Sequence, residues 1–226
     1  MNNDLQRKQR GWVENSELSA YKNKSSDELS ALLFSENSVE RTIAAKLIPL
    51  TCEISDILLS VLKNEPALYT RLALTEKLES GEQTTALRMI DFLAAIGNNQ
   101  HRTPIAPSKK KSFPLPRDLI ARSLGRMNPE IFPTLLEAAE QLPSSQLSEL
   151  IDAIGYMAYY HPTLATVENY QRLLQIKKVH SNESLIQWKF LICFSAFPQS
   201  TELLQKEEQF ADEAQRSLKL LALKKD

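Results

Sequence analysis

Glycine and cysteine are scarce in this chain. Its 226 residues include 5 glycines and 2 cysteines, and β-branched residues rarely alternate with polar ones. Scarce glycine with abundant leucine, alanine, glutamate and lysine favours helices over strands. Cys52 and Cys193 are far apart and lack the spacing of metal ligands, so we expect two reduced thiols and no disulfide framework.

Long apolar runs are also missing. No stretch approaches the roughly 18 apolar residues of a membrane-spanning helix. Residues 1–24 are polar throughout and lack the apolar core of a signal peptide. The hydrophobic content of 42% nevertheless argues against wholesale disorder. We therefore expect a folded cytoplasmic protein with no membrane partner.

The sequence contains no recognisable catalytic or cofactor motif. The histidines, His101, His161 and His180, are dispersed and lack zinc-ligand spacing. A glycine-rich phosphate loop and a nucleophile elbow are both missing, and no carboxylate stands in an apolar setting that would tune its pKa. We expect no catalytic residues, no cofactor and no metal site, and hence a protein that is not an enzyme.

An internal repeat is the most informative pattern that is present. Arg41, Arg71 and Arg117 are each followed by an aliphatic residue or alanine at +3, a small residue at +4 and a large aliphatic residue at +7. A fourth copy has Leu147 in the arginine position. Two of the three intervals are equal, and the middle one is longer. A repeated period of this size predicts stacked pairs of helices.

These copies resemble the second helix of HEAT-type repeats, in which an arginine precedes an alanine-rich pair and a terminal leucine. The resemblance covers about residues 25–200 and is best at Arg41 and Arg117; the copy at Arg71 has Leu74 and Thr75 in the alanine positions. It implies an all-α fold, a right-handed α–α superhelix of five to six antiparallel helix pairs. We expect residues 1–24 to form an arm or capping helix, and residues 201–226 to form capping helices.

The resemblance also gives the repeated arginines a role. In HEAT-type repeats this arginine usually bonds to an acid or a carbonyl of a neighbouring repeat. Asp56, Asp91 and Asp118 are available for such pairing. The alternative is that the arginines align as a track for a bound anion.

A basic block occupies the long interval of the repeat, although the net charge of the chain is only −1. Residues 98–113 form a polar segment that is too long for an idle helix connection. We expect either a solvated flexible loop or a patch that contacts an anionic partner. No aromatic residue interleaves with the lysines, so base stacking is not indicated. The candidate partner-binding residues of this block are Arg102, Lys109, Lys110, Lys111, Arg117, Arg122 and Arg126.

An aromatic group follows the basic block in the sequence. Tyr156, Tyr159 and Tyr160 lie at one predicted helix end, and Trp188 lies in a later helix. Tyrosine and tryptophan with few basic neighbours suit a groove that binds a peptide. The alternative is that these rings pack in the core between two helix pairs.

The predicted function is non-catalytic binding of a protein or peptide by a HEAT-type scaffold or adaptor. A nucleic-acid-binding or DNA-repair module using the basic residues of 98–127 is the alternative, because some alkylpurine DNA glycosylases are HEAT-like. Those enzymes present tryptophan and aspartate in a DNA-facing groove, whereas Trp12 and Trp188 here stand near opposite ends of the chain. A third class, lyase-like accessory proteins acting on a cofactor-bearing partner, is favoured by no residue.

Overall fold

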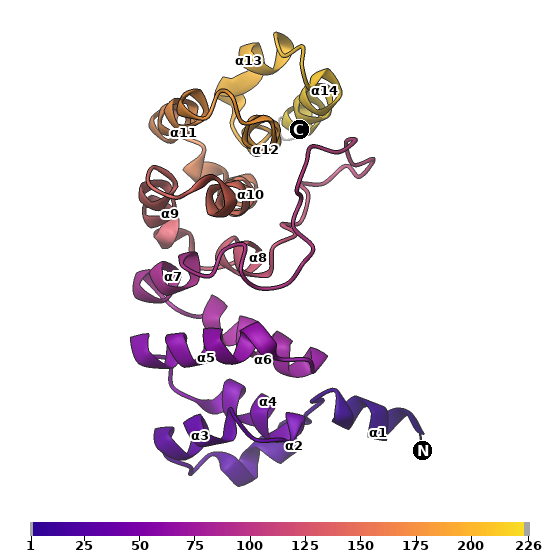
Figure 1. Cartoon of the computed structure of the whole chain (residues 1–226), viewed down its shortest axis with the longest axis vertical. Coiled ribbons are helices and arrows are strands. Elements are labelled where there is room, and N and C mark those ends of the chain that lie inside the picture. The colour runs from indigo at the N-terminus through magenta and orange to yellow at the C-terminus, as the bar shows by residue number, and fades with distance from the viewer. Residues whose placement is uncertain (1, 224–226) are drawn as a thin grey trace. The chain divides into compact units, whose positions relative to one another are not determined.

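The computed structural model describes residues 2–223 (Figure 1). These residues form 14 α-helices and four short 3-10 helices, and they contain no β-strand. The predicted all-α class is therefore confirmed. The chain divides after Ile96 into two compact units, which are described separately below.

The first unit contains seven α-helices and one 3-10 helix. Three of its helices begin at polar side chains that cap the helix: Ser25 accepts a hydrogen bond from the backbone N–H of Glu28, Asn37 from that of Val39, and Thr51 from that of Ile54. The helices are α1 (Asn2–Gln9), α2 (Asn15–Leu18), η1 (Ser19–Tyr21), α3 (Ser26–Leu32), α4 (Ser38–Leu47), α5 (Cys52–Asn64), α6 (Leu68–Glu79) and α7 (Gln83–Ile90).

Helices of the first unit pack in pairs, and successive pairs contact each other. α3 packs on α4 and α5 on α6, while α4 also contacts α6 and α5 contacts α7. Two buried hydroxyl pairs join these rows: Thr42 with Thr70 at 2.9 Å, and Ser55 with Thr85 at 3.1 Å. Polar groups between the helices are thus satisfied without water.

The N-terminal arm is docked on the first unit. α1 contacts α4, and the ring of Trp12 meets that of Tyr69 edge to face at 5.0 Å. The chain passes this point at Gly11, whose φ of +83° favours glycine. A Cβ atom there would come within 2.5 Å of the Thr70 hydroxyl and 2.7 Å of the Thr42 hydroxyl. The arm approaches α4 and α6 this closely because residue 11 has no side chain.

The second unit contains the other seven α-helices and three 3-10 helices. Its first helix is preceded by a long segment without regular structure. The elements are α8 (Leu119–Leu124), η2 (Pro129–Ile131), α9 (Phe132–Ala139), α10 (Ser144–Tyr160), η3 (Pro162–Leu164), α11 (Val167–Val179), α12 (Ser184–Phe194), η4 (Pro198–Ser200), α13 (Thr201–Gln205) and α14 (Ala211–Ala222).

The helices of the second unit form two rows. α8, α10, α12 and α14 contact one another in succession, and α9 contacts α11. Pairs α9–α10, α11–α12 and α13–α14 join the rows. α12 is the most apolar of these helices: all its residues from Trp188 to Phe194 are buried. The unit therefore has a core between the rows, with α12 at its centre.

The repeat predicted from the sequence coincides with the core-facing side of four helices. In every copy the residues at +3, +4 and +7 are buried. These residues are Ala44, Ala45 and Ile48; Leu74, Thr75 and Leu78; Ile120, Ala121 and Leu124; and Leu150, Ile151 and Ile154.

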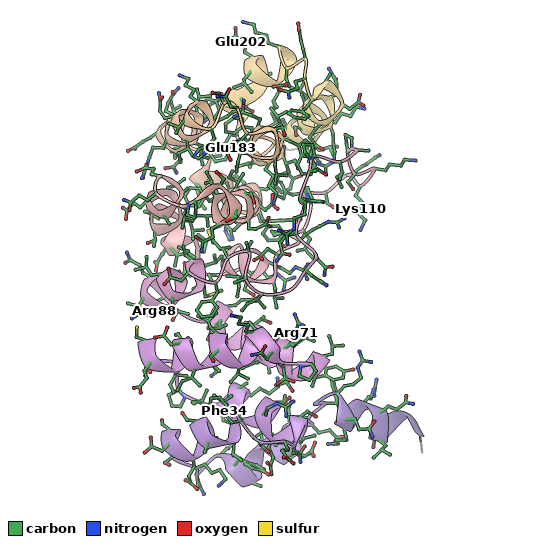
Figure 2. All side chains as sticks on the ribbon, viewed as in Figure 1. Phe34, Arg71, Arg88, Lys110, Glu183 and Glu202 are labelled. Carbon is green, nitrogen blue, oxygen red and sulfur yellow. The ribbon has the colours of Figure 1, made fainter. Side chains whose placement is uncertain are left out.

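The repeated arginines do not share one role. Arg41 donates two hydrogen bonds to the Glu65 carboxylate, at 2.7 and 2.8 Å, and one at 2.7 Å to the Ser35 carbonyl. Of the two alternatives for this arginine, the structure shows the bond to an acid, and that acid is Glu65 rather than one of the three aspartates named above. The side chain of Arg71 (Figure 2) has no hydrogen bond or ion pair with any described residue. Arg117 precedes α8, so it does not occupy the matching helix position. The expected set of equivalent arginines is therefore wrong.

Because Arg41 is paired and Arg71 is not, we expect their replacement by alanine to lower the stability of the protein by different amounts. The Arg41 side chain is 13% exposed and that of Glu65 is 1% exposed, so Arg41→Ala leaves a buried carboxylate without its charge partner. We expect the free energy of unfolding to fall by about 3–5 kcal/mol. Arg71→Ala, the matched control, is expected to change it by about 0.5 kcal/mol or less. Urea titrations of both variants measure the difference, and equal losses would contradict this assignment.

Candidate functional site

The polar segment before α8 folds against the helices of the second unit. Arg216 on α14 donates through Nε to the Ser108 carbonyl and through Nη2 to the Ser112 carbonyl, both at 3.0 Å. Its Nη1 pairs with the Glu213 carboxylate at 3.2 Å. Arg216 is buried, so water competes little for these bonds. The segment 98–113 is therefore bonded to α14 at two points, although most of its residues are exposed.

Phe113 anchors the same segment in an aromatic cluster. Its side chain is buried together with Trp188 and Ile192, and Tyr156 and Tyr159 pack against this group. The ring centroid of Phe113 lies 5.2 Å from that of Tyr159 and 6.2 Å from that of Tyr156. Rings at these separations contribute beyond the area that they bury.

A glycine in α10 makes room for this anchor. A Cβ atom at Gly155 would lie 2.7 Å from Cζ of Phe113 and 2.8 Å from Cα of Cys193. Both contacts are closer than real Cβ atoms show, so any other residue would displace the ring or α12. Gly155 therefore lets the segment and α12 approach α10 together.

Both predicted groups of partner-binding residues lie in the second unit, and three of their members, Lys110, Arg117 and Trp188, line one cavity there. Arg122 in the basic group and Trp188 in the aromatic group depart most from the expectation of exposed side chains. Arg122 is half-buried and donates to the Pro116 carbonyl at 3.1 Å, and Trp188 is buried. Tyr156 and Tyr159 are partly buried and Tyr160 is half exposed. The exposed basic residues are Arg102, Lys109, Lys110, Lys111, Arg117 and Arg126.

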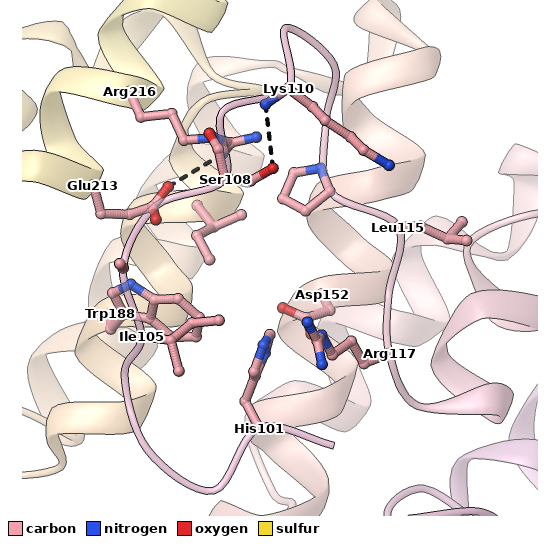
Figure 3. Close-up of a pocket in the computed structure, with 13 residues that line it drawn as sticks. His101, Ile105, Ser108, Lys110, Leu115, Arg117, Asp152, Trp188, Glu213 and Arg216 are labelled. Atoms are coloured by element: carbon pink, nitrogen blue, oxygen red, sulfur yellow. Dashed lines mark hydrogen bonds and ion pairs between the residues drawn. The ribbon is translucent and has the colours of Figure 1, made fainter. Parts of the chain in front are cut away.

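A cavity of about 420 Å³ lies between this segment and α10, α12 and α14 (Figure 3). Its volume falls in the range of ligand-binding cavities, roughly 300–1,000 Å³. Apolar and charged side chains both contribute to the walls. The lining residues are His101, Ile105, Ala106, Ser108, Lys110, Pro114, Leu115, Arg117, Asp152, Trp188, Ile192, Glu213 and Arg216.

A buried charge cluster lies behind the α10 wall of the cavity. The Lys189 ammonium bonds to Glu149 at 3.0 Å and to Asp152 at 2.9 Å, and Lys189 has no exposed surface. Burial opposes the charge on Lys189, but the two carboxylates outweigh it and raise its pKa. Burial also raises the pKa of Glu149, against the attraction of Lys189. One ammonium thus serves two carboxylates, of which Asp152 reaches the cavity.

Among the described residues, His101 and Trp188 each bring to the cavity wall a buried nitrogen without a hydrogen-bond partner. The His101 ring meets that of Trp188 edge to face at 5.1 Å, and the unpartnered atom of His101 is its Nε2. Burial lowers the pKa of His101, Asp152 opposes this effect, and Lys189 and Arg117 add to it. Since buried polar atoms in proteins are nearly always paired, Nε2 is suited to a ligand atom.

The charged groups of the cavity differ in whether they already have partners. Asp152 pairs with Lys189, and Glu213 pairs with Arg216. Burial raises the pKa of Glu213, and Arg216 and the nearby indole N–H of Trp188 oppose this effect. The indole N–H makes no hydrogen bond of normal length with any described residue. The side chains of Arg117 and Lys110 pair with no described residue, so the unpaired charges are both positive.

Sequence reasoning missed several residues of this cavity. Lys189 is a lone charge in the apolar run of α12, and this is the signal that could have revealed a buried ion pair. Glu149 and Asp152 are one helical turn apart in α10, where they share a face. His101 was visible as a residue of the polar segment, but only the folded segment places it against Trp188.

A search of the described residues for metal sites and membrane spans, and comparisons with known proteins, give no indication of the function. Within residues 2–223, no three His, Cys, Asp or Glu side chains form a group that could hold a metal ion, and no helix is long and apolar enough to cross a membrane. No protein-family model, curated protein or solved structure matches the chain. The resemblance to HEAT-type repeats therefore stays a prediction.

The charge cluster predicts a large loss of stability for Lys189→Met. This change leaves Glu149 and Asp152 close together without a cation, and we expect the free energy of unfolding at neutral pH to fall by about 3–5 kcal/mol. Guanidinium titration measures it. A loss below about 1 kcal/mol, the usual size for an exposed ion pair, would contradict the burial of the cluster.

Glu149→Gln is the matched control, and pH separates the two variants. Because the pKa of Glu149 is raised in the folded protein above its ordinary 4.5, its contribution to stability is fully present below the unfolded pKa. That contribution is lost as the pH rises through the folded pKa. Glu149→Gln is therefore expected to flatten the fall in stability above about pH 4.5 and to cost less than Lys189→Met at neutral pH.

The Arg216 contacts predict protection of the lysine run from trypsin. Lys109, Lys110 and Lys111 lie between the two anchored carbonyls, so their backbone cannot extend into a protease without breaking those bonds. Arg216→Lys keeps a charge beside Glu213 but loses the planar fork, and we expect cleavage at these lysines to accelerate. Lys219→Gln on the same helix is the control. Mass spectrometry measures the rate of cleavage. If that rate is the same in Arg216→Lys as in the parent, the two Arg216 hydrogen bonds do not hold the segment.

Proposed function

We propose that this chain is a non-catalytic scaffold or adaptor that binds a peptide segment of a partner protein, and that the segment enters the cavity of the second unit. The observation that carries the proposal is the composition of the cavity wall. Trp188, Ile192, Ile105 and Leu115 supply apolar surface, and Arg117 and Lys110 supply charges without partners. Apolar surface with a few oriented polar groups is typical of a recognition site.

The absence of catalytic chemistry is part of the proposal. Ser108 supplies the one hydroxyl among the lining side chains, and its oxygen lies 3.3 Å from the backbone nitrogen of Lys110. The Cys193 thiol is buried, and burial raises its pKa, which disfavours the thiolate. The charged groups beside His101 are Asp152, Lys189 and Arg117. Asp152 is already paired with Lys189, and Arg117 is left to bind a ligand.

The finer architecture and the location also remain proposals. A right-handed HEAT-type superhelix of five to six helix pairs is supported by the equal burial of the four repeat copies and by the two rows of helices in the second unit. The many charged residues of α14 suit a terminal capping helix. A cytoplasmic location is also part of the proposal, and the free thiols of Cys52 and Cys193 support it.

Nucleic-acid binding is the second candidate, and one observation favours it. A second hollow, of about 460 Å³, lies between the same segment and α14, and its walls include Lys109, Lys110, Lys111, Lys219 and Arg216 with Asp212 as the acid. Such a groove suits a polyanion. Under the peptide proposal, a DNA or RNA oligonucleotide is expected to bind only weakly in 0.15 M salt. Nucleic acid would be favoured instead if the parent binds it with micromolar affinity and the triple variant, with Lys109, Lys110 and Lys111 all changed to Ser, does not.

The peptide proposal is tested with a library of random synthetic peptides that carry free C-termini. Peptides retained by the full chain are expected to lose affinity by about tenfold or more for Ile105→Ser, because that change removes apolar surface from the cavity wall. Val179→Ser is the matched control, since Val179 on α11 is 79% exposed and does not line the cavity. Isothermal titration calorimetry gives the affinities.

Two outcomes would overturn the peptide proposal. One is that no peptide is enriched on the parent chain above an unrelated helical protein. The other is that enriched peptides bind Ile105→Ser as tightly as the parent, or lose as much affinity with Val179→Ser, since the cavity would then not be the binding site.

A further inference from the structure

The charges around the cavity constrain the charge of its ligand. The side chains that line it include three cations and two carboxylates: Lys110, Arg117 and Arg216, against Asp152 and Glu213. With every group ionised, one positive charge is left over. A ligand with a single negative charge therefore neutralises the site, whereas a cation would add to the excess.

Two groups without hydrogen-bond partners among the described residues lie close together in the cavity wall. In Figure 3 the His101 ring and the Arg117 guanidinium converge near Asp152, and the His101 ring also meets the Trp188 ring edge to face at 5.1 Å. An Arg guanidinium can donate two parallel hydrogen bonds to a carboxylate, and a neutral imidazole can donate one. A carboxylate placed here would satisfy both the free guanidinium of Arg117 and the buried Nε2 of His101.

The part of the wall formed by Trp188 and Ile105 suits an apolar side chain. Trp188 lines the cavity as a buried ring, and Ile105 is 47% exposed and lines the same space. The partial exposure of such a large aliphatic residue leaves apolar area that a ligand can cover. An apolar group against this wall and an anion beside Arg117 would fit one compact ligand.

We propose that the cavity binds a carboxylate together with the apolar side chain next to it, both from a partner peptide, with Arg117 and His101 contacting the carboxylate. This rests on the proposed peptide-binding function and adds the chemistry of the recognised group. Two sources carry that chemistry: the α-carboxylate of an apolar C-terminal residue, and the side chain of a glutamate beside an apolar residue within a chain. Lys109 and Lys111, both exposed, would attract either one before contact.

The test uses three acetylated synthetic peptides of equal length. The first ends in leucine with a free carboxylate, the second is the same peptide with an amidated end, and the third is amidated and has an internal glutamate beside leucine. We expect the first or the third to bind the full chain at least about tenfold more tightly than the second. Whichever of the two binds more tightly identifies the source. Isothermal titration calorimetry gives the dissociation constants.

Variants then assign the contacts. Arg117→Gln is expected to remove the preference for the carboxylate peptide, while Arg102→Gln, an exposed arginine of the same segment outside the cavity lining, is expected to keep it. His101→Phe keeps an aromatic ring beside Trp188 but loses the donor. Affinity of the parent should rise as pH falls below about 6.5, because burial lowers the pKa of His101 from that ordinary value and an anion favours the imidazolium, and this rise should vanish in His101→Phe. Asp152, Lys189 and Arg117 are the charged groups that face His101, and the variant leaves them in place.

The outcomes separate this inference from the function on which it rests. If all three peptides bind equally and Ile105→Ser weakens all of them, peptide binding stands and carboxylate recognition is wrong. The inference also fails if Arg117→Gln and Arg102→Gln lower affinity alike. If none of the peptides binds, and the random library yields no ligand, both proposals are wrong.

Discussion

The guanidinium of Arg216 bonds two carbonyls of one segment, and the candidate site depends on this arrangement. Ser108 and Ser112 are fixed at both sides of the lysine run, which sets the path of the chain from there to Phe113. Phe113 can then reach the cluster of Trp188 and Ile192, over the gap left by Gly155. The cavity forms because the segment before α8, which has no regular structure, is held against α10, α12 and α14. The Arg216 guanidinium and the buried Phe113 ring hold it there.

The buried ammonium of Lys189 fixes a second relation, the one between α10 and α12. Its two carboxylate partners both come from α10, so α12 cannot slide along α10 without separating the charges. An apolar residue of the same size would fill the space without fixing this register, because dispersion is not directional. The same contact sets the position of Asp152 in the cavity wall. The stability of the fold and the geometry of the cavity therefore both depend on the Lys189 ammonium.

Most of the helical structure could be predicted from the sequence, because it depends on periodicity within short segments. The +3, +4 and +7 positions of the repeat are all buried, as expected when one face of each helix meets a neighbour. The roles of Arg71 and Arg117 could not be predicted, since they depend on which acid comes within reach in three dimensions. The site was only partly visible for the same reason. Lys110, Arg117 and Trp188 were selected by residue type, but His101, Asp152 and Arg216 gain their meaning from contacts across long sequence separations.

The distance in sequence between Arg216 and its carbonyl partners has a consequence for synthesis on the ribosome. These contacts join residues that are 104 and 108 positions apart, whereas the packed helix pairs join neighbours in the chain. Helices emerging early can pair while the rest is still being translated. The cavity cannot close until α14 has emerged, so a nascent or prematurely terminated chain would carry the repeat but no binding site. Competence for binding therefore requires that translation has passed α14.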